Sequence, residues 1–211
     1  PVTSMGLVLL LLVAYRSWKT PLHGVLPLAS AGLAGLGAVA LLFTEVHGIT
    51  DPLVQPDGQD PQTALEEIAT TMHKAIAYGM PLIAFNTAYD WTVLNFELSR
   101  HNLPMMGDRL GSTLPTLVDP HVIDKQVDRY VKGTGMRKLK PTAERYGVEL
   151  DDWHTADADA LAALLIAEAQ FQRYPQLADM GPQQLYAAQK AWRAEQQAGL
   201  QQWFRTKASP E

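Results

Sequence analysis

The chain has 211 residues, enough for one α/β domain with a substantial hydrophobic core. It contains no cysteine, which excludes disulfide bonds and thiolate metal sites and favours a cytoplasmic location. The formal net charge is −5, so the surface as a whole does not attract nucleic acid, and nucleic-acid binding would require a local basic patch.

Acidic residues are distributed unevenly along the chain. Residues 1–44 contain no Asp or Glu, and their only formal charges are Arg16 and Lys19. This pattern predicts three regions: an atypical apolar segment at 1–44, an α/β domain at 45–173 and a polar helical tail at 174–211.

After residue 60, apolar residues recur at helical spacing, and two short apolar runs have the length of strands. Leu65, Ile68, Met72 and Ile76 follow helical spacing, and Gly79 is a plausible helix stop. We expect helices at 62–78, 91–101, 122–130, 138–146, 158–171 and 182–204, strands at 81–85 and 116–119, and a turn at 86–90. Strands that alternate with helices predict an α/β fold with helices on both faces of a sheet. Such folds place their chemistry at the carboxyl ends of the strands.

Two groups of polar residues adjoin these elements. Asn86, Tyr89 and Asp90 come directly after the first predicted strand, and His154 and Asp159 lie at the start of an alanine-rich helix. A carboxylate and an imidazole placed in this way can face one cleft. Taken alone, an acid such as Asp90 is more often a helix cap than a metal ligand.

The order of these motifs resembles the DEDDh family of 3′–5′ exonucleases, which includes the proofreading subunit of the bacterial replicative polymerase. Asn-x-x-Tyr-Asp at 86–90 is followed, about 65 residues later, by His-x-x-x-x-Asp at 154–159. The His-Gly-Ile-Thr segment at 47–50 is also similar to this family, and further segments look like its actinobacterial branch, at 118–125, 145–148 and 192–196. The resemblance covers roughly residues 44–207.

The resemblance implies an RNase H-like fold, with a mixed sheet flanked by helices, and metal-dependent hydrolysis. In this family four acids hold two Mg²⁺ or Mn²⁺ ions about 4 Å apart, and a histidine takes a proton from the attacking water. Carried over to this chain, Asp90 and Asp159 are metal ligands, His154 is the general base, and Asn86 and Tyr89 shape the cleft. The implied substrates are 3′ ends of single-stranded DNA or RNA, the product is a nucleoside 5′-monophosphate, and a DNA polymerase is a possible partner.

The first motif of the family, Asp-x-Glu, is missing from this chain. It should lie near the extreme N-terminus, where the sequence has no acid, and Glu45 instead occupies the approach to the segment at 47–50. Two carboxylates would then face two divalent ions, so we expect weak metal binding and little or no catalysis. The alternative is a catalytically inactive exonuclease-like module that binds nucleic acid or a polymerase.

Residues 1–44 have three competing interpretations. They could be a buried apolar segment that replaces the first strands, with residues 7–13 as one strand. They could be a membrane element, since residues 21–43 carry no formal charge and are long enough to span; the protein would then be a membrane-tethered interaction protein. They could also be an out-of-frame translation, which the encoding DNA would reveal.

A basic set could contact phosphates near the cleft: Lys132, Arg137, Lys138, Lys140 and Arg145 fall within 14 residues. Lys138 and Lys140 are the substrate-binding candidates in this set. The alternative is a solvated face of a helix and a loop.

The acids after the second predicted strand are interpreted differently. Asp119 and Asp124 are expected to be helix caps or structural groups, with a role in the cleft as the alternative. Met105 and Met106 are expected to pack in the core or in a loop.

Overall fold

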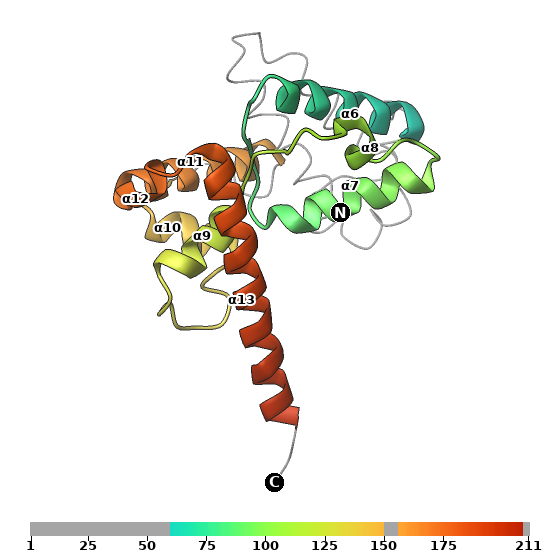
Figure 1. The fold of residues 1–211 in the computed structure, drawn as a ribbon. Helices are drawn as coiled ribbons and strands as arrows, with labels where there is room; N and C mark the ends of the chain where they lie inside the picture. Colours follow the sequence, from blue (N-terminus) through green and yellow to red (C-terminus); the bar gives the residue numbers. More distant parts are fainter. Residues whose placement is uncertain (1–59, 150–155, 209–211) are drawn as a thin grey trace, which may run out of the picture.

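The computed structural model describes residues 60–149 and 156–208 (Figure 1). Its two strands are β1 (Leu82–Ile83) and β2 (Leu117–Val118). The helices are α6 (Pro61–Ala77), α7 (Thr87–Arg100), α8 (Met106–Leu110), α9 (Pro120–Val127), α10 (Leu139–Arg145), α11 (Ala156–Arg173), α12 (Pro175–Ala178) and α13 (Pro182–Ala208). The predicted segment at 1–44 and the motif at 47–50 lie outside these ranges.

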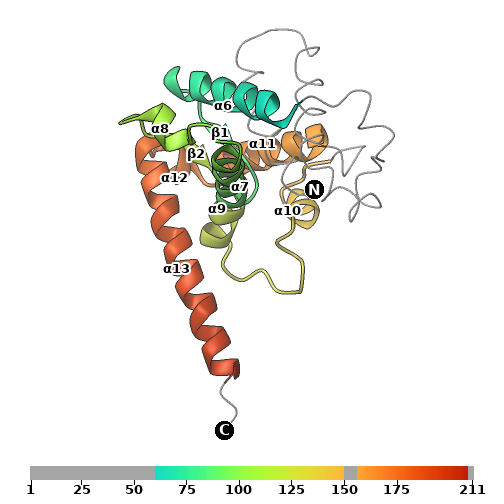
Figure 2. The ribbon, with the colours of Figure 1, turned by 90° about the vertical axis from the view of Figure 1, so that its right-hand side faces the viewer.

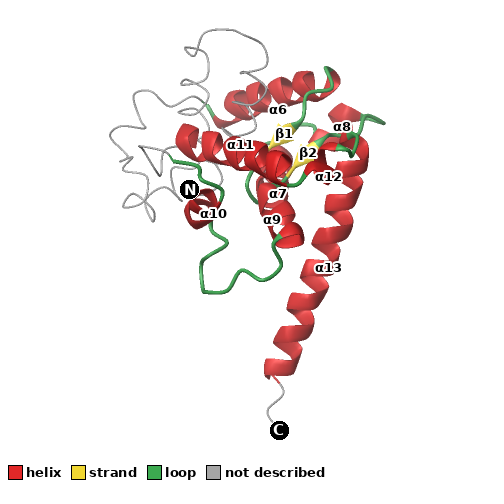
Figure 3. Cartoon of the chain, turned by 90° about the vertical axis from the view of Figure 1, so that its left-hand side faces the viewer, coloured by secondary structure: helices red, strands yellow, loops and turns green. Residues whose placement is uncertain are grey.

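A parallel pair of strands separates two hydrophobic clusters. Leu82 pairs with Leu117, and Ile83 pairs with Val118. Successive strand residues point to opposite faces. Leu82 therefore packs in a first cluster with α6, α7, α8 and the start of α11. Ile83 and Val118 pack in a second cluster with α9, α12 and α13. Figure 3 shows the strands enclosed by these helices. Helices on both faces confirm the predicted α/β class.

Most elements predicted from periodicity are present, but the predicted turn at 86–90 is wrong. Helix α7 already begins at Thr87, so Asp90 lies within the helix. The reversal after β1 is confined to Asn86, whose φ of 68° lies in the left-handed region that asparagine tolerates. The pattern also does not predict α8 and α12, because helices of four or five residues contain too few apolar positions to show a period.

The finer prediction of an RNase H-like mixed sheet stays a prediction, because the described sheet consists of one parallel pair of strands. The predicted domain boundary at residue 44 and the possible membrane element at 21–43 lie outside the described ranges. Within those ranges no helix combines the length and the apolar character needed to cross a membrane. The tail after residue 173 packs on the second cluster through Leu177 and Leu185.

Helix α13 begins beside β2 and then extends away from the other helices (Figures 1 and 2). Its Gln189 is only 5% exposed. The side-chain Nε2 donates to the carbonyl of Leu117 at 2.9 Å, and Oε1 accepts the N–H of Asp119 at 2.7 Å. These backbone groups lie on the edge of β2 that faces away from β1. The amide of Gln189 thus satisfies this edge as a neighbouring strand would.

We predict that Gln189→Ala lowers the free energy of unfolding by about 3 kcal/mol, because it leaves two buried backbone groups without partners. Urea denaturation measures the effect. The matched control is Gln197→Ala, on the exposed part of the same helix, which should cost less than about 0.5 kcal/mol. Equal losses in the two variants would contradict this role of Gln189.

Candidate functional site

The candidate site lies at the carboxyl ends of the two strands, where Asp119 joins the turn after β1 to the turn after β2. Asp119 is the N-cap of α9 and is 6% exposed. Its Oδ1 accepts the backbone N–H groups of Asn86 at 2.9 Å, His121 at 3.0 Å and Val122 at 3.4 Å. The interpretation of Asp119 as a helix cap is confirmed, and the same carboxylate fixes the start of α7.

Asp90 lies in the first turn of α7 and is buried, with 4% exposure. Burial raises the pKa of Asp90 to about 7; a hydrogen bond from its own backbone N–H acts against this shift, and the nearby Asp119 carboxylate adds to it. No cation forms an ion pair with Asp90 within the part of the chain that the structure describes. At neutral pH this carboxyl group is therefore divided between its neutral and ionised forms.

The second metal-ligand candidate, Asp159, is a buried residue of α11. Its neighbour Ala160 packs in the same hydrophobic cluster as Leu94, one turn after Asp90 on α7. The two candidate acids thus come from helices that share one core cluster. His154, the candidate base, lies outside the described residues.

The substrate-binding candidates occupy two different places. Asn86 is half-buried at the start of α7, and the Tyr89 side chain is 43% exposed. Lys138 and Lys140 are exposed at the start of α10, which packs against α11. The structure thus places Asn86 and Tyr89 beside Asp90 in sequence and space, and the two lysines on a separate helix.

The residue types suit Mg²⁺ or Mn²⁺, but they supply only part of a site. Carboxylate oxygens are the ligands that these hard cations prefer, and a bound cation would favour the ionised form of Asp90. Among residues 60–149 and 156–208, however, no group of three His, Cys, Asp or Glu could hold a metal ion. Asp90 and Asp159 are of the residue type that such a site uses, but the described residues do not make up a metal site.

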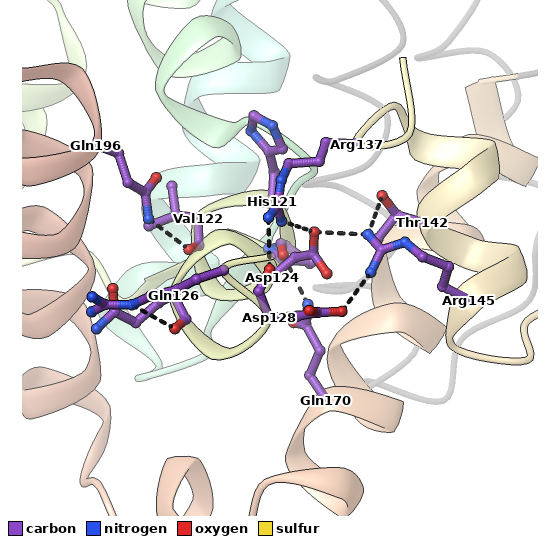
Figure 4. Close-up of polar contacts among 12 residues, drawn as sticks. His121, Val122, Asp124, Gln126, Asp128, Arg137, Thr142, Arg145, Gln170 and Gln196 are labelled. Atoms are coloured by element: carbon purple, nitrogen blue, oxygen red, sulfur yellow. Dashed lines mark hydrogen bonds and ion pairs between the residues drawn. The ribbon is translucent and has the colours of Figure 1, made fainter. Parts of the chain in front are cut away.

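A second buried acid, Asp124 on α9, has a different environment (Figure 4). Its side chain is fully buried, and Oδ2 accepts from Arg137 Nη1 at 2.6 Å and from Arg145 Nη2 at 2.8 Å. Arg145 also contacts the Asp128 carboxylate at 3.2 Å. The structural interpretation of Asp124 is confirmed, and two members of the basic set, Arg137 and Arg145, are held by these acids.

Sequence reasoning missed the contribution of α13 to this region. Besides Gln189, the Arg193 guanidinium donates from Nη1 to Asn86 Oδ1 at 3.4 Å, across 107 positions of sequence. Gln196 donates to the carbonyl of Val122 at 3.1 Å. Gln189, Arg193 and Gln196 recur at helical spacing, which indicates a shared face, but nothing local in the sequence identifies their partners.

Comparisons of the chain with protein-family models, with curated proteins and with solved structures found no match.

The pKa of Asp90 predicts how stability depends on pH. In an unfolded chain an aspartate has a pKa of about 3.9, so folding takes up a proton between about pH 4 and 7, and stability falls as pH rises through this window. Asp119, with a pKa raised to about 6 by burial, acts in the same direction. Between pH 5 and pH 8 the free energy of unfolding should therefore fall by about 2–3 kcal/mol less in Asp90→Asn than in the wild type.

Urea denaturation at the two pH values, in EDTA, measures this difference. Asp179→Asn, at an exposed acid, serves as the control and should follow the wild type. A drop in Asp90→Asn as large as that of the wild type would show that Asp90 does not carry the pH dependence.

For the ion-pair cluster we predict that Asp124→Ala lowers the free energy of unfolding by about 3 kcal/mol, because the part-buried Arg137 loses its counter-ion and Arg145 keeps only Asp128. Asp128→Ala removes a more exposed carboxylate from the same cluster and should cost under about 1 kcal/mol. Chemical denaturation measures the loss of stability in both variants, and similar losses would contradict the prediction.

Proposed function

We propose that this chain is an exonuclease domain of the DEDDh type that acts on 3′ ends of single-stranded nucleic acid, with hydrolysis impaired by an incomplete set of acids. One observation carries the proposal: the buried carboxyl group of Asp90, with a pKa raised to about 7, in the first turn of the helix that follows β1. Burial of an acid without a cationic partner costs stability, and such groups cluster at functional sites.

The fold supports this proposal at a coarse level. Parallel strands with crossover helices place ligand sites outside the carboxyl ends of the strands, and Asp90 follows one such end. The RNase H-like mixed sheet is the form of the fold that we propose. A cytoplasmic location and a DNA polymerase partner are parts of the same proposal.

Each candidate residue has a definite role in the proposed reaction. Asp90 and Asp159 would offer carboxylate oxygens to Mg²⁺ or Mn²⁺, and a bound ion would supply charge stabilisation at the phosphate. His154 would accept the proton of the attacking water. Asn86 and the exposed ring of Tyr89 would border the 3′ nucleotide, and Lys138 and Lys140 would contact phosphates farther along the strand.

The pKa of Asp90 sets how this site would respond to pH. A cation competes with the proton for the same carboxylate, so metal binding should strengthen as pH rises through about 7. Below that value Asp90 is mostly neutral and is a poor ligand.

A second function has one specific observation in its favour. The described residues contain no set of three metal ligands, and the sequence has no acid in residues 1–44. A domain with this composition could bind a 3′ end without cutting it. This alternative is an exonuclease-like binding module for nucleic acid or a polymerase.

Incubation of excess protein with a 5′-labelled single-stranded oligonucleotide and Mn²⁺ tests the proposal. We expect slow shortening from the 3′ end, because part of the metal site is missing. Asp90→Asn and His154→Ala should each abolish the shortening, since they remove a metal ligand and the base.

Asp179→Asn, at an exposed acid, is the matched control and should cut at the wild-type rate. Binding without any shortening would support the binding module in place of the exonuclease. If the folded protein neither binds nor shortens the oligonucleotide, both functions are rejected.

A further inference from the structure

Helices α7, α9 and α13 enclose an open-sided crevice next to Asp119, with a volume of about 190 Å³. Trp91 and Thr92 of α7, Val122 of α9, and Tyr186, Lys190 and Arg193 of α13 line it. Asp90 belongs to the buried side of α7 together with Leu94, whereas Trp91 and Thr92 belong to the side that meets α13. Asp90 is not among the residues that line the crevice, although Asp119, which lines it, lies close enough to act on Asp90.

Two cations line this crevice and a third lies near it. Lys190 and Arg193 lie one turn apart on α13, and neither forms an ion pair within the part of the chain that the structure describes. Lys125 of α9 lies close enough that Arg193 helps to lower its pKa, after the larger effects of burial and Arg137. In a chain of net charge −5, such a concentration of positive charge favours an anionic ligand.

One acid, Asp119, also lines the crevice. Its Oδ1 accepts three backbone N–H groups, but burial outweighs them and raises the pKa of Asp119 to about 6, and Arg193 lies close enough to act against this rise. Arg193 thus already interacts with Asp119 and Asn86, whereas Lys190 is exposed and forms no ion pair in the described part of the chain.

The size and the aromatic walls of the crevice narrow the class of ligand. A volume of about 190 Å³ is below the ~300–1,000 Å³ of sites that enclose a whole small molecule, so the crevice fits one unit of a larger ligand. The rings of Trp91 and Tyr186 offer stacking faces, and the Lys190 ammonium already lies 5.8 Å from the Tyr186 ring centre. Aromatic faces beside cations match the bases and phosphates of a single strand.

We propose that the crevice binds one nucleotide of a single-stranded nucleic acid, with its base against Trp91 and Tyr186 and its phosphate against Lys190 and Arg193. This inference rests on the proposed function, because it assumes that the substrate is a nucleic-acid strand. It adds a subsite on α13, apart from the motifs at 86–90 and 154–159, which would hold the strand away from the reacting 3′ end.

The test is equilibrium binding in EDTA, where no metal-dependent cutting occurs. Binding of the full-length protein and its variants is followed by the fluorescence anisotropy of labelled 12-mers of deoxyuridine, of uridine and of abasic deoxyribose. Lys190→Ala should weaken binding of all three strands about five-fold at 0.1 M salt, because it removes one phosphate contact, and should reduce the slope of log affinity against log salt by about 0.7. Trp91→Leu should weaken the two base-bearing strands about ten-fold and leave the abasic strand unchanged.

Lys207→Ala is the matched control for Lys190→Ala. Lys207 lies over the ring of Trp203, four residues earlier on the same helix, as Lys190 lies over Tyr186, but it is outside the crevice. Lys207→Ala should bind as the wild type does. Because Lys190 is exposed, its replacement should not disturb folding; Tyr186→Leu provides a second aromatic variant if Trp91→Leu is unstable.

Loss of binding confined to the crevice variants supports the subsite, and the preferred 12-mer identifies the sugar that it accepts. Equal losses in Lys190→Ala and Lys207→Ala, or no binding by the wild type, would overturn it. If the protein cuts in Mn²⁺ but all variants bind equally well, the proposed function stands and the proposed subsite is rejected. Crevice-dependent binding without cutting would keep the subsite in a module that does not hydrolyse.

Discussion

The carboxylate of Asp119 is the interaction on which the rest of the site depends. Each strand is only two residues long, so the ladder between β1 and β2 supplies few hydrogen bonds. Asp119 adds three more from backbone N–H groups, and one of these fixes Asn86 in the left-handed conformation that begins α7. The Thr87 hydroxyl reinforces the same junction by donating to the carbonyl of Ala84 at 2.6 Å. The position of Asp90, one turn into α7, follows from these contacts.

Helix α13 makes this junction depend on the far end of the sequence. Gln189 satisfies the outer edge of β2, and Arg193 reaches the side chain of Asn86. These contacts keep the first half of the helix beside the sheet, while its second half extends away from the other helices (Figure 2). The crevice exists only because α13 is docked in this way, since three of the residues named above as lining it, Tyr186, Lys190 and Arg193, belong to that helix.

Two buried acids, Asp124 and Asp90, differ in whether their carboxyl groups have a cationic partner. Asp124 has two guanidinium partners on Oδ2, so its charge is paired, and the group joins α9 to the loop before α10. Asp90 has no such partner among the described residues, and burial raises its pKa to about 7. A buried, unpaired acid is unfavourable for folding, whereas a site that receives a cation needs a carboxylate whose charge the protein has left uncompensated.

The sequence by itself determined the elements and the acids at their ends. Apolar spacing predicted the long helices, and short apolar runs predicted both strands, because the period of a helix and the length of an apolar run are local properties of the sequence. The motif order placed Asp90 after β1 and Asp159 in the first turns of α11. Only the tertiary structure decided the start of α7 at Thr87, the capture of Arg137 and Arg145 by Asp124, and the docking of α13 on β2. The physical reason is that these outcomes depend on partners from distant parts of the sequence, up to 107 positions away for Asn86 and Arg193, and a local pattern carries no record of what packs against it.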